Sequence, residues 1–235
     1  MTATPTTHRR VGPLRMAIAS ACAGLIALAG AGFVTAQEAP RSSISAVGII
    51  NADGLQIGTV IGSETGGALT LTVTVSNLPP GEHGVHIHET GSCEPPFDSA
   101  GGHFNPDGTM HGPGSATIVV QEQAPEEGEA TPEAEPAVAA SPVANTESHA
   151  GDLGNITIDD SGRISVAITT SSVTLAPDQP NSLADADGSA LVIHAGADDL
   201  HTDPSGESGD RIACAVLFAP ADGGGIATPE ATPAS

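Results

Sequence analysis

The histidines are the residues of this chain best suited to chemistry, and they are unevenly placed. The chain has nine histidines, and all except His8 fall between positions 83 and 201. His86 and His88 flank Ile87 in an apolar run. Successive side chains of a strand point to opposite faces, so we expect both imidazoles on one face and Ile87 in the core. Two imidazoles placed in this way can hold a metal ion, although many such pairs are ordinary surface residues.

A second group of candidate ligands lies in the stretch that follows. A Phe-Asn-Pro-Asp-Gly turn separates His103 from His111, and Asp152 follows three positions after His149. Three imidazoles and one carboxylate make a closed tetrahedral set, which is typical of structural zinc. His194 ends another apolar run, from which its ring can face back toward the first pair of histidines.

The segments that must position these ligands indicate an all-β fold. Gly (29) and Pro (19) are plentiful, and the apolar residues come in short runs. The clearest alternation is in residues 69–76, where Leu and Val alternate with Thr and Ser, as in a strand with one buried face. Short strands divided by turns favour an antiparallel Greek-key β-sandwich or flattened barrel. Eight strands are expected, at Ser43–Asn51, Leu55–Ser63, Ala68–Leu78, His83–Glu89, Asp152–Asp159, Arg163–Thr174, Ser189–His194 and Arg211–Ala219.

Between these strands the composition changes. The long stretches 90–151 and 195–210 contain or adjoin the histidines, which predicts metal-binding loops. Within the first, residues 121–148 form an acidic Ala/Pro/Glu insert, and residues 221–235 form a tail of similar texture. Neither can bury enough apolar surface to offset its ordering entropy, so we expect both to be disordered. One domain is expected over residues 37–220, and the apolar start of the insert is a candidate for a further short strand.

The N-terminus has the features of an export signal. Basic residues precede an apolar stretch, and small residues ending at Ala36 suit cleavage there. We expect a signal peptide over residues 1–36 and an exported product with no stable membrane association after cleavage. The alternative is an uncleaved anchor at residues 16–36, which are just long enough to span a bilayer. Cleavage leaves Cys93 and Cys214, and an even pair in an exported protein indicates one disulfide, with two buried thiols as the alternative.

The charge balance excludes one class of partner. Acidic residues number 28 against 6 basic ones, and the formal net charge is −22. None of the basic residues is lysine. A surface of this kind repels phosphate backbones, so nucleic acid is excluded as a partner.

Together with their neighbours in sequence, the histidines closely resemble those of the copper/zinc superoxide dismutases. The resemblance runs from about residue 43 to residue 219 and is interrupted only by the acidic insert. The extra residues 94–98 are typical of bacterial members. The motifs, in the family's order, are Gly84-Val85-His86-Ile87-His88-Glu89, Ser99-Ala100-Gly101-Gly102-His103-Phe104-Asn105-Pro106, His149-Ala150-Gly151-Asp152-Leu153-Gly154-Asn155, His194-Ala195-Gly196-Ala197-Asp198-Asp199 and Gly209-Asp210-Arg211-Ile212-Ala213-Cys214.

The resemblance implies a role for each position. The copper ligands would be His86, His88, His103 and His194. The zinc ligands would be His103, His111, His149 and Asp152, with the deprotonated ring of His103 bridging both ions. Asp198 resembles the carboxylate that hydrogen-bonds the free ring nitrogens of two ligands, His86 and His111, and so fixes their orientation. Arg211 resembles the guanidinium that holds the anionic substrate, and Cys93 and Cys214 match the family's disulfide.

The implied activity is dismutation of superoxide. One superoxide reduces the copper and leaves as dioxygen, while His103 takes a proton. A second superoxide reoxidises the copper and leaves as hydrogen peroxide, while the zinc is structural. A non-enzymatic copper-binding or delivery protein on the same fold is the alternative, and the loss of a copper ligand or of Arg211 would have favoured it. The oligomeric state is either a monomer or a homodimer. His83 and His201 match no ligand, and both are expected to be exposed loop residues.

Overall fold

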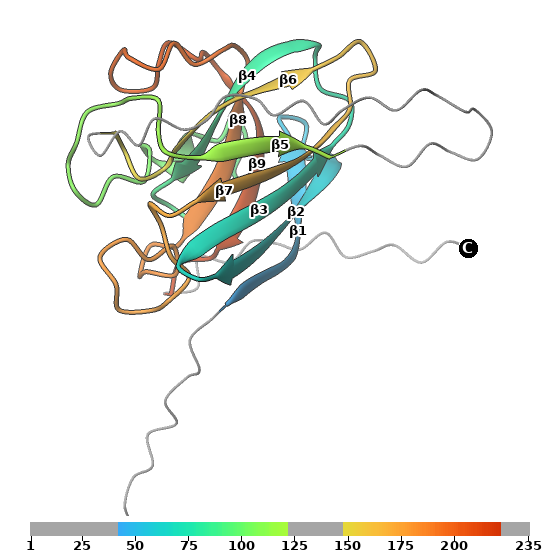
Figure 1. Cartoon of the computed structure of the whole chain (residues 1–235). Coiled ribbons are helices and arrows are strands. Elements are labelled where there is room, and N and C mark those ends of the chain that lie inside the picture. Colours follow the sequence, from blue (N-terminus) through green and yellow to red (C-terminus); the bar gives the residue numbers. More distant parts are fainter. Residues whose placement is uncertain (1–41, 122–147, 222–235) are drawn as a thin grey trace, which may run out of the picture. The chain divides into compact units, whose positions relative to one another are not determined.

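The computed structural model describes residues 42–121 and 148–221 (Figure 1). The chain divides into two compact units, Met1–Glu38 and Ala39–Ser235, and every described residue belongs to the second. The expected signal peptide lies outside the described residues, as do nearly all of the acidic insert and of the C-terminal tail. No helix in the described ranges is long and apolar enough to cross a membrane.

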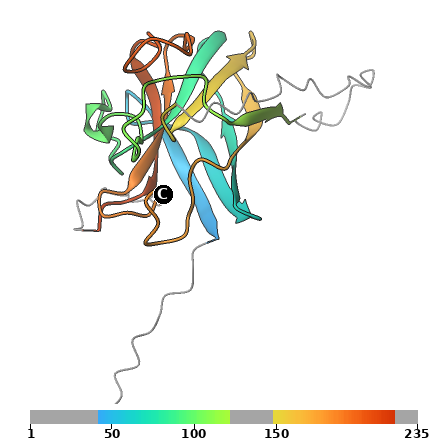
Figure 2. The ribbon, with the colours of Figure 1, turned by 60° about the vertical axis from the view of Figure 1, so that its left-hand side comes forward.

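The described residues form one antiparallel sheet that curls into a nearly closed barrel (Figures 1 and 2). The strand order is β5-β7-β3-β2-β1-β9-β8-β4-β6. The strands are β1 (Ser43–Asn51), β2 (Gln56–Thr65), β3 (Ala68–Val75), β4 (Gly81–His88), β5 (Thr117–Val120), β6 (Asp152–Ile158), β7 (Ile164–Thr170), β8 (Ser189–His194) and β9 (Arg211–Phe218). The all-β prediction is therefore confirmed, and each of the eight expected strands is present: β1 and β8 have the expected bounds and the other six differ slightly.

Two differences from the predicted strands have physical reasons. The candidate at the start of the insert forms the ninth strand, β5, which pairs with β7. The strand expected to reach Thr174 ends at Thr170, because the chain then turns across one end of the barrel. Glu64 holds this turn by accepting hydrogen bonds from the Thr174 hydroxyl (2.7 Å) and the Leu175 amide (2.7 Å), and the Leu175 side chain is fully buried.

The barrel interior follows from the alternation in the sequence. Leu69, Leu71 and Val73 of β3 are completely buried, while the threonines between them lie on the outer face. On that outer face the hydroxyls of Thr70 and Thr169 lie 2.9 Å apart on neighbouring strands. Hydroxyls thus pair across the outer face while apolar side chains fill the core.

The metal-bearing loop between β4 and β6 is attached to the sheet at several points. His88 pairs with His103 in an isolated β-bridge. On either side of the segment that is not described, the Gln121 amide donates to the Ser165 carbonyl (2.7 Å) and the Thr109 hydroxyl donates to the Ser148 carbonyl (2.8 Å). Both ends of the insert are therefore held in place.

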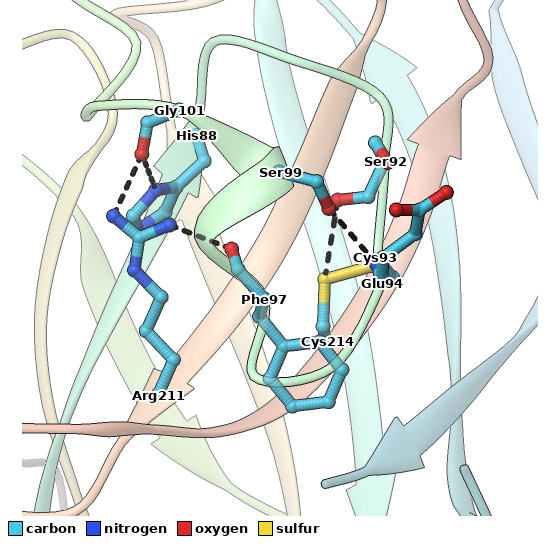
Figure 3. Close-up of a disulfide and its surroundings, with 9 residues drawn as sticks. All are labelled: His88, Ser92, Cys93, Glu94, Phe97, Ser99, Gly101, Arg211 and Cys214. Carbon is cyan, nitrogen blue, oxygen red and sulfur yellow. Dashed lines mark hydrogen bonds between the residues drawn. A yellow bond between two sulfur atoms is a disulfide. The ribbon is translucent and has the colours of Figure 1, made fainter. Parts of the chain in front are cut away.

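A disulfide joins the same loop to β9. Cys93 and Cys214 are bonded, with their Cα atoms 5.7 Å apart, so the alternative of two free thiols is wrong (Figure 3). The bond closes a span of 121 residues.

Replacement of both cysteines by serine should destabilise the fold. Loss of a crosslink over 121 residues restores chain entropy to the unfolded state, with an expected decrease of about 5 kcal/mol in the free energy of unfolding. Chemical denaturation monitored by circular dichroism measures this change, and the parent protein in reductant is the control. A decrease below about 1 kcal/mol in both samples would contradict the prediction.

Candidate metal centre

Four imidazoles converge beside the paired strands β4 and β8. His86 and His88 lie on β4, His194 ends the adjacent strand β8, and His103 is brought beside His88 by the β-bridge. All four rings are buried, and one nitrogen from each lies within 4.8 Å of the others. The set that the sequence predicts is therefore assembled by two neighbouring strands and the start of the long loop.

Each of these rings leaves one buried nitrogen without a hydrogen-bond partner among the described residues. A buried polar atom without a partner is costly, so the convergence of four at one point indicates that something else binds them. Imidazole nitrogens are ordinary ligands of copper. The atoms are His86 Nδ1, His88 Nε2, His103 Nε2 and His194 Nε2.

The opposite nitrogens of these rings are held by acceptors. His88 Nδ1 donates to the Gly101 carbonyl (3.0 Å), and His194 Nδ1 donates to the Gly209 carbonyl (3.1 Å). His86 Nε2 donates to an oxygen of Asp198 (2.7 Å). Each contact places the proton on the far side of its ring and leaves the lone pair of the near nitrogen directed into the cluster.

The second predicted set has the dimensions of a zinc site. Asp152 Oδ1 lies 2.8 Å from Nδ1 of His103, 3.1 Å from Nδ1 of His111 and 3.3 Å from Nδ1 of His149. Nδ1 of His149 also lies 3.3 Å from Nδ1 of His103. Donors about 2.0 Å from the centre of a tetrahedron are separated by about 3.3 Å, so these atoms fit around one zinc ion.

Two residues connect the sets. His103 directs Nδ1 toward Asp152 and leaves Nε2 with the unpartnered nitrogens, so its ring is placed to bridge two ions. Asp198 accepts from Nε2 of His111 (2.8 Å) with one oxygen and from His86 with the other. The carboxylate thus has the position that the family resemblance implies, and it fixes one ring in each set.

Burial governs the protonation of two of these rings. It is the largest cause that lowers the pKa of His103 to about 4 and that of His194 to about 3, and neighbouring imidazoles act in the same direction. Both rings are therefore neutral near pH 7, as metal ligands must be. Burial opposes the charged form of Asp152, but hydrogen bonds from His103 and His111 outweigh it and hold the Asp152 pKa well below its usual range.

The prediction for His83 is wrong, because this side chain is only 1% exposed. Its Nδ1 lies 2.7 Å from the carbonyl oxygen of His194 and its Nε2 lies 2.9 Å from that of Pro79, so the ring ties a ligand-bearing residue to the turn before β4. The alternation of side chains along the strand indicates this burial, because His83 shares the inward face with Val85 and Ile87. His201 is exposed, as expected.

A small cavity opens beside the unpartnered nitrogens. It has a volume of about 200 Å³, and His103, His194 and Arg211 line it together with small or uncharged residues. The Arg211 guanidinium donates to the carbonyls of Phe97 (2.7 Å) and Gly101 (2.7 Å), as Figure 3 shows. One positive group is therefore fixed at the wall of the cavity.

Comparisons with known proteins agree with this geometry. The family model described as copper/zinc superoxide dismutase matches residues 57–217. The chain belongs to the copper/zinc superoxide dismutase family. Superoxide dismutase [Cu-Zn] 2 of Aquifex aeolicus is 38% identical over 171 residues, which span 72% of this chain and 83% of that protein.

Solved structures of the family have the same fold. A superoxide dismutase-like protein from Bacillus subtilis aligns with a TM-score of 0.57 and 32% identity, over 73% of this chain and 97% of that one. The Cu/Zn superoxide dismutase of Brucella abortus aligns with a TM-score of 0.51 and 27% identity, over 74% and 99% of the two chains. Copper and zinc are the cofactors of the family, and the two ligand sets found here fit them.

Replacement of a residue that belongs to only one ligand set should weaken the binding of one metal and leave the binding of the other unchanged. His88→Ala removes a copper-facing nitrogen but none of the zinc-facing ones, so we expect at least a tenfold loss of copper affinity with zinc retained at the parent's level. Elemental analysis after dialysis against a chelator measures both metals. His201→Ala, which removes an exposed imidazole, is the matched control. Parallel loss of both metals from His88→Ala would show that the sets do not act separately.

Proposed function

We propose that this chain is a superoxide dismutase, with His86, His88, His103 and His194 as copper ligands and His103, His111, His149 and Asp152 as zinc ligands. One observation carries the proposal: four unpartnered imidazole nitrogens converge beside a cavity that His103 and His194 line and whose wall holds a fixed guanidinium. A small anion in this cavity meets a metal ion and a positive side chain together.

The residues around the cavity have distinct tasks. Bound copper supplies the one-electron steps that convert two superoxide ions and two protons into dioxygen and hydrogen peroxide. Arg211 binds and orients the anion, and its two carbonyl contacts fix the direction of approach. When its Nε2 is not bound to copper, His103 would hold a proton there and release it to the departing peroxide, while its Nδ1 stays in the zinc set. Asp198 keeps the rings of His86 and His111 in orientation.

A non-enzymatic copper-binding or delivery protein on the same fold is the competing function. Storage or delivery requires the copper ligands but not a guanidinium at the cavity. The presence of Arg211, held by two backbone carbonyls, supports the enzymatic proposal.

We also propose that the chain is exported after cleavage of residues 1–36, that superoxide is its substrate and that it acts as a monomer or homodimer. The export signal in the sequence and the disulfide support an oxidising compartment.

The protein loaded with copper and zinc should consume superoxide catalytically, and Arg211→Ala should lower the second-order rate constant at least tenfold. Among the residues that line the cavity, Arg211 is the one whose side chain is always positively charged near pH 7. Pulse radiolysis measures the rate. Arg163→Ala, which removes an exposed positive charge outside this cavity, is the control and should match the parent. A loaded parent protein that binds both metals and consumes no superoxide would favour copper delivery.

Added salt should raise the parent's rate constant or leave it unchanged. The net charge of −22 opposes the approach of an anion, while Arg211 attracts it at short range. Screening over a Debye length of about 8 Å at physiological ionic strength weakens the distant repulsion more than the contact in the cavity. The rate constant at several NaCl concentrations tests this expectation. A steep fall in rate as salt is added would mean that the field around the cavity is attractive and would contradict it.

A further inference from the structure

The guanidinium at the cavity donates hydrogen bonds to backbone carbonyls. Its Nη1 and Nη2 donate to the carbonyls of Phe97 and Gly101, each at 2.7 Å, and among the described residues no carboxylate lies within ion-pair distance of Arg211, although the Asp98 carboxylate attracts its charge from farther away. The direction of the guanidinium therefore depends on the backbone of residues 97–101.

These two carbonyls flank a single turn of 3-10 helix, Asp98–Ala100. Phe97 caps its start, where its carbonyl also accepts from the Ala100 amide (3.1 Å). Gly101 ends the turn, and its amide donates to the Asp98 carbonyl (3.1 Å). A change in the conformation of Phe97 would therefore move one anchor of Arg211 and rotate the turn that carries the other.

Phe97 has a backbone conformation that phenylalanine rarely adopts. Its φ is 76°, in the left-handed region that favours glycine. The side chain is completely buried in a small apolar cluster with Ala190, Val192 and Cys214, apart from the main core. In Figure 3 its carbonyl faces Arg211, while its ring points the other way and lies beside Cys214. Burial of the ring offsets the cost of this backbone conformation.

We propose that Phe97 is a positioning residue for Arg211: its buried ring locks the left-handed backbone that presents the carbonyl to the guanidinium. The proposal rests on the proposed function only in giving Arg211 the task of binding an anion.

Two substitutions separate positioning from stability. Phe97→Ala removes the ring and retains the backbone preference against positive φ, so it should lose both stability and anion affinity. Phe97→Gly also removes the ring but tolerates φ of 76°, so it should be the more stable of the two while binding anions no better. Leu175→Ala, which empties a buried site near Glu64, is the control for general loss of packing.

The measurement is azide affinity of the copper- and zinc-loaded proteins, followed by the visible absorption of the copper. We expect azide to bind on the order of tenfold more weakly to both Phe97 variants and as tightly to Leu175→Ala as to the parent. Denaturant midpoints of the same proteins give their stabilities. Unchanged azide affinity in the Phe97 variants, or affinity that follows stability across all three variants, would overturn the proposal.

A double variant tests whether Phe97 acts through Arg211. Azide affinity and superoxide consumption of Phe97→Ala/Arg211→Ala should equal those of Arg211→Ala, because the proposed role of the ring is to position Arg211 alone. A further loss in the double variant would show that Phe97 acts elsewhere and would overturn the proposal. If the parent binds azide but consumes no superoxide, the proposed function fails, and the azide series still decides the role of Phe97.

Discussion

Hydrogen bonds on the far side of the copper-facing rings are the interactions on which the centre depends. An imidazole can offer a lone pair from one nitrogen only if its proton is kept on the other, and here Gly101, Gly209 and Asp198 keep it there for three rings. Two of these acceptors are backbone carbonyls in loops that follow β4 and β8. The loops must therefore pass at a fixed distance behind the strands, which explains why irregular segments around this site are so closely tied to the sheet.

Asp198 and His103 make the two ligand sets interdependent. Asp198 is hydrogen-bonded to one ring of each set, and His103 contributes a nitrogen to each. Asp152 in turn holds the zinc-side rings with a carboxylate that stays charged despite burial. Disturbance of the zinc side is therefore transmitted to the copper side through these two side chains.

The sequence allowed much of this arrangement to be predicted, for identifiable reasons. Alternation in β3 indicated the buried face, and the spacing of His86 and His88 placed them on one side of a strand. The position of Asp198 came from resemblance, because no local pattern shows which rings a loop carboxylate will reach. His83 was misassigned because comparison with known ligands was given more weight than strand alternation. The role of Phe97 was not visible, since its effect passes through a backbone carbonyl and a positive φ, which composition does not reveal.

The attachments at Gln121 and Ser148 have a consequence for the engineering of this chain. Hydrogen bonds and neighbouring zinc-set residues already fix the two ends of the segment between them. Once the ends are fixed, each doubling of the intervening length costs only about 0.6 kcal/mol in closure entropy. This stretch is therefore a suitable insertion site. An affinity tag, a fluorescent reporter or a second folded domain can be added here without altering the register of any strand.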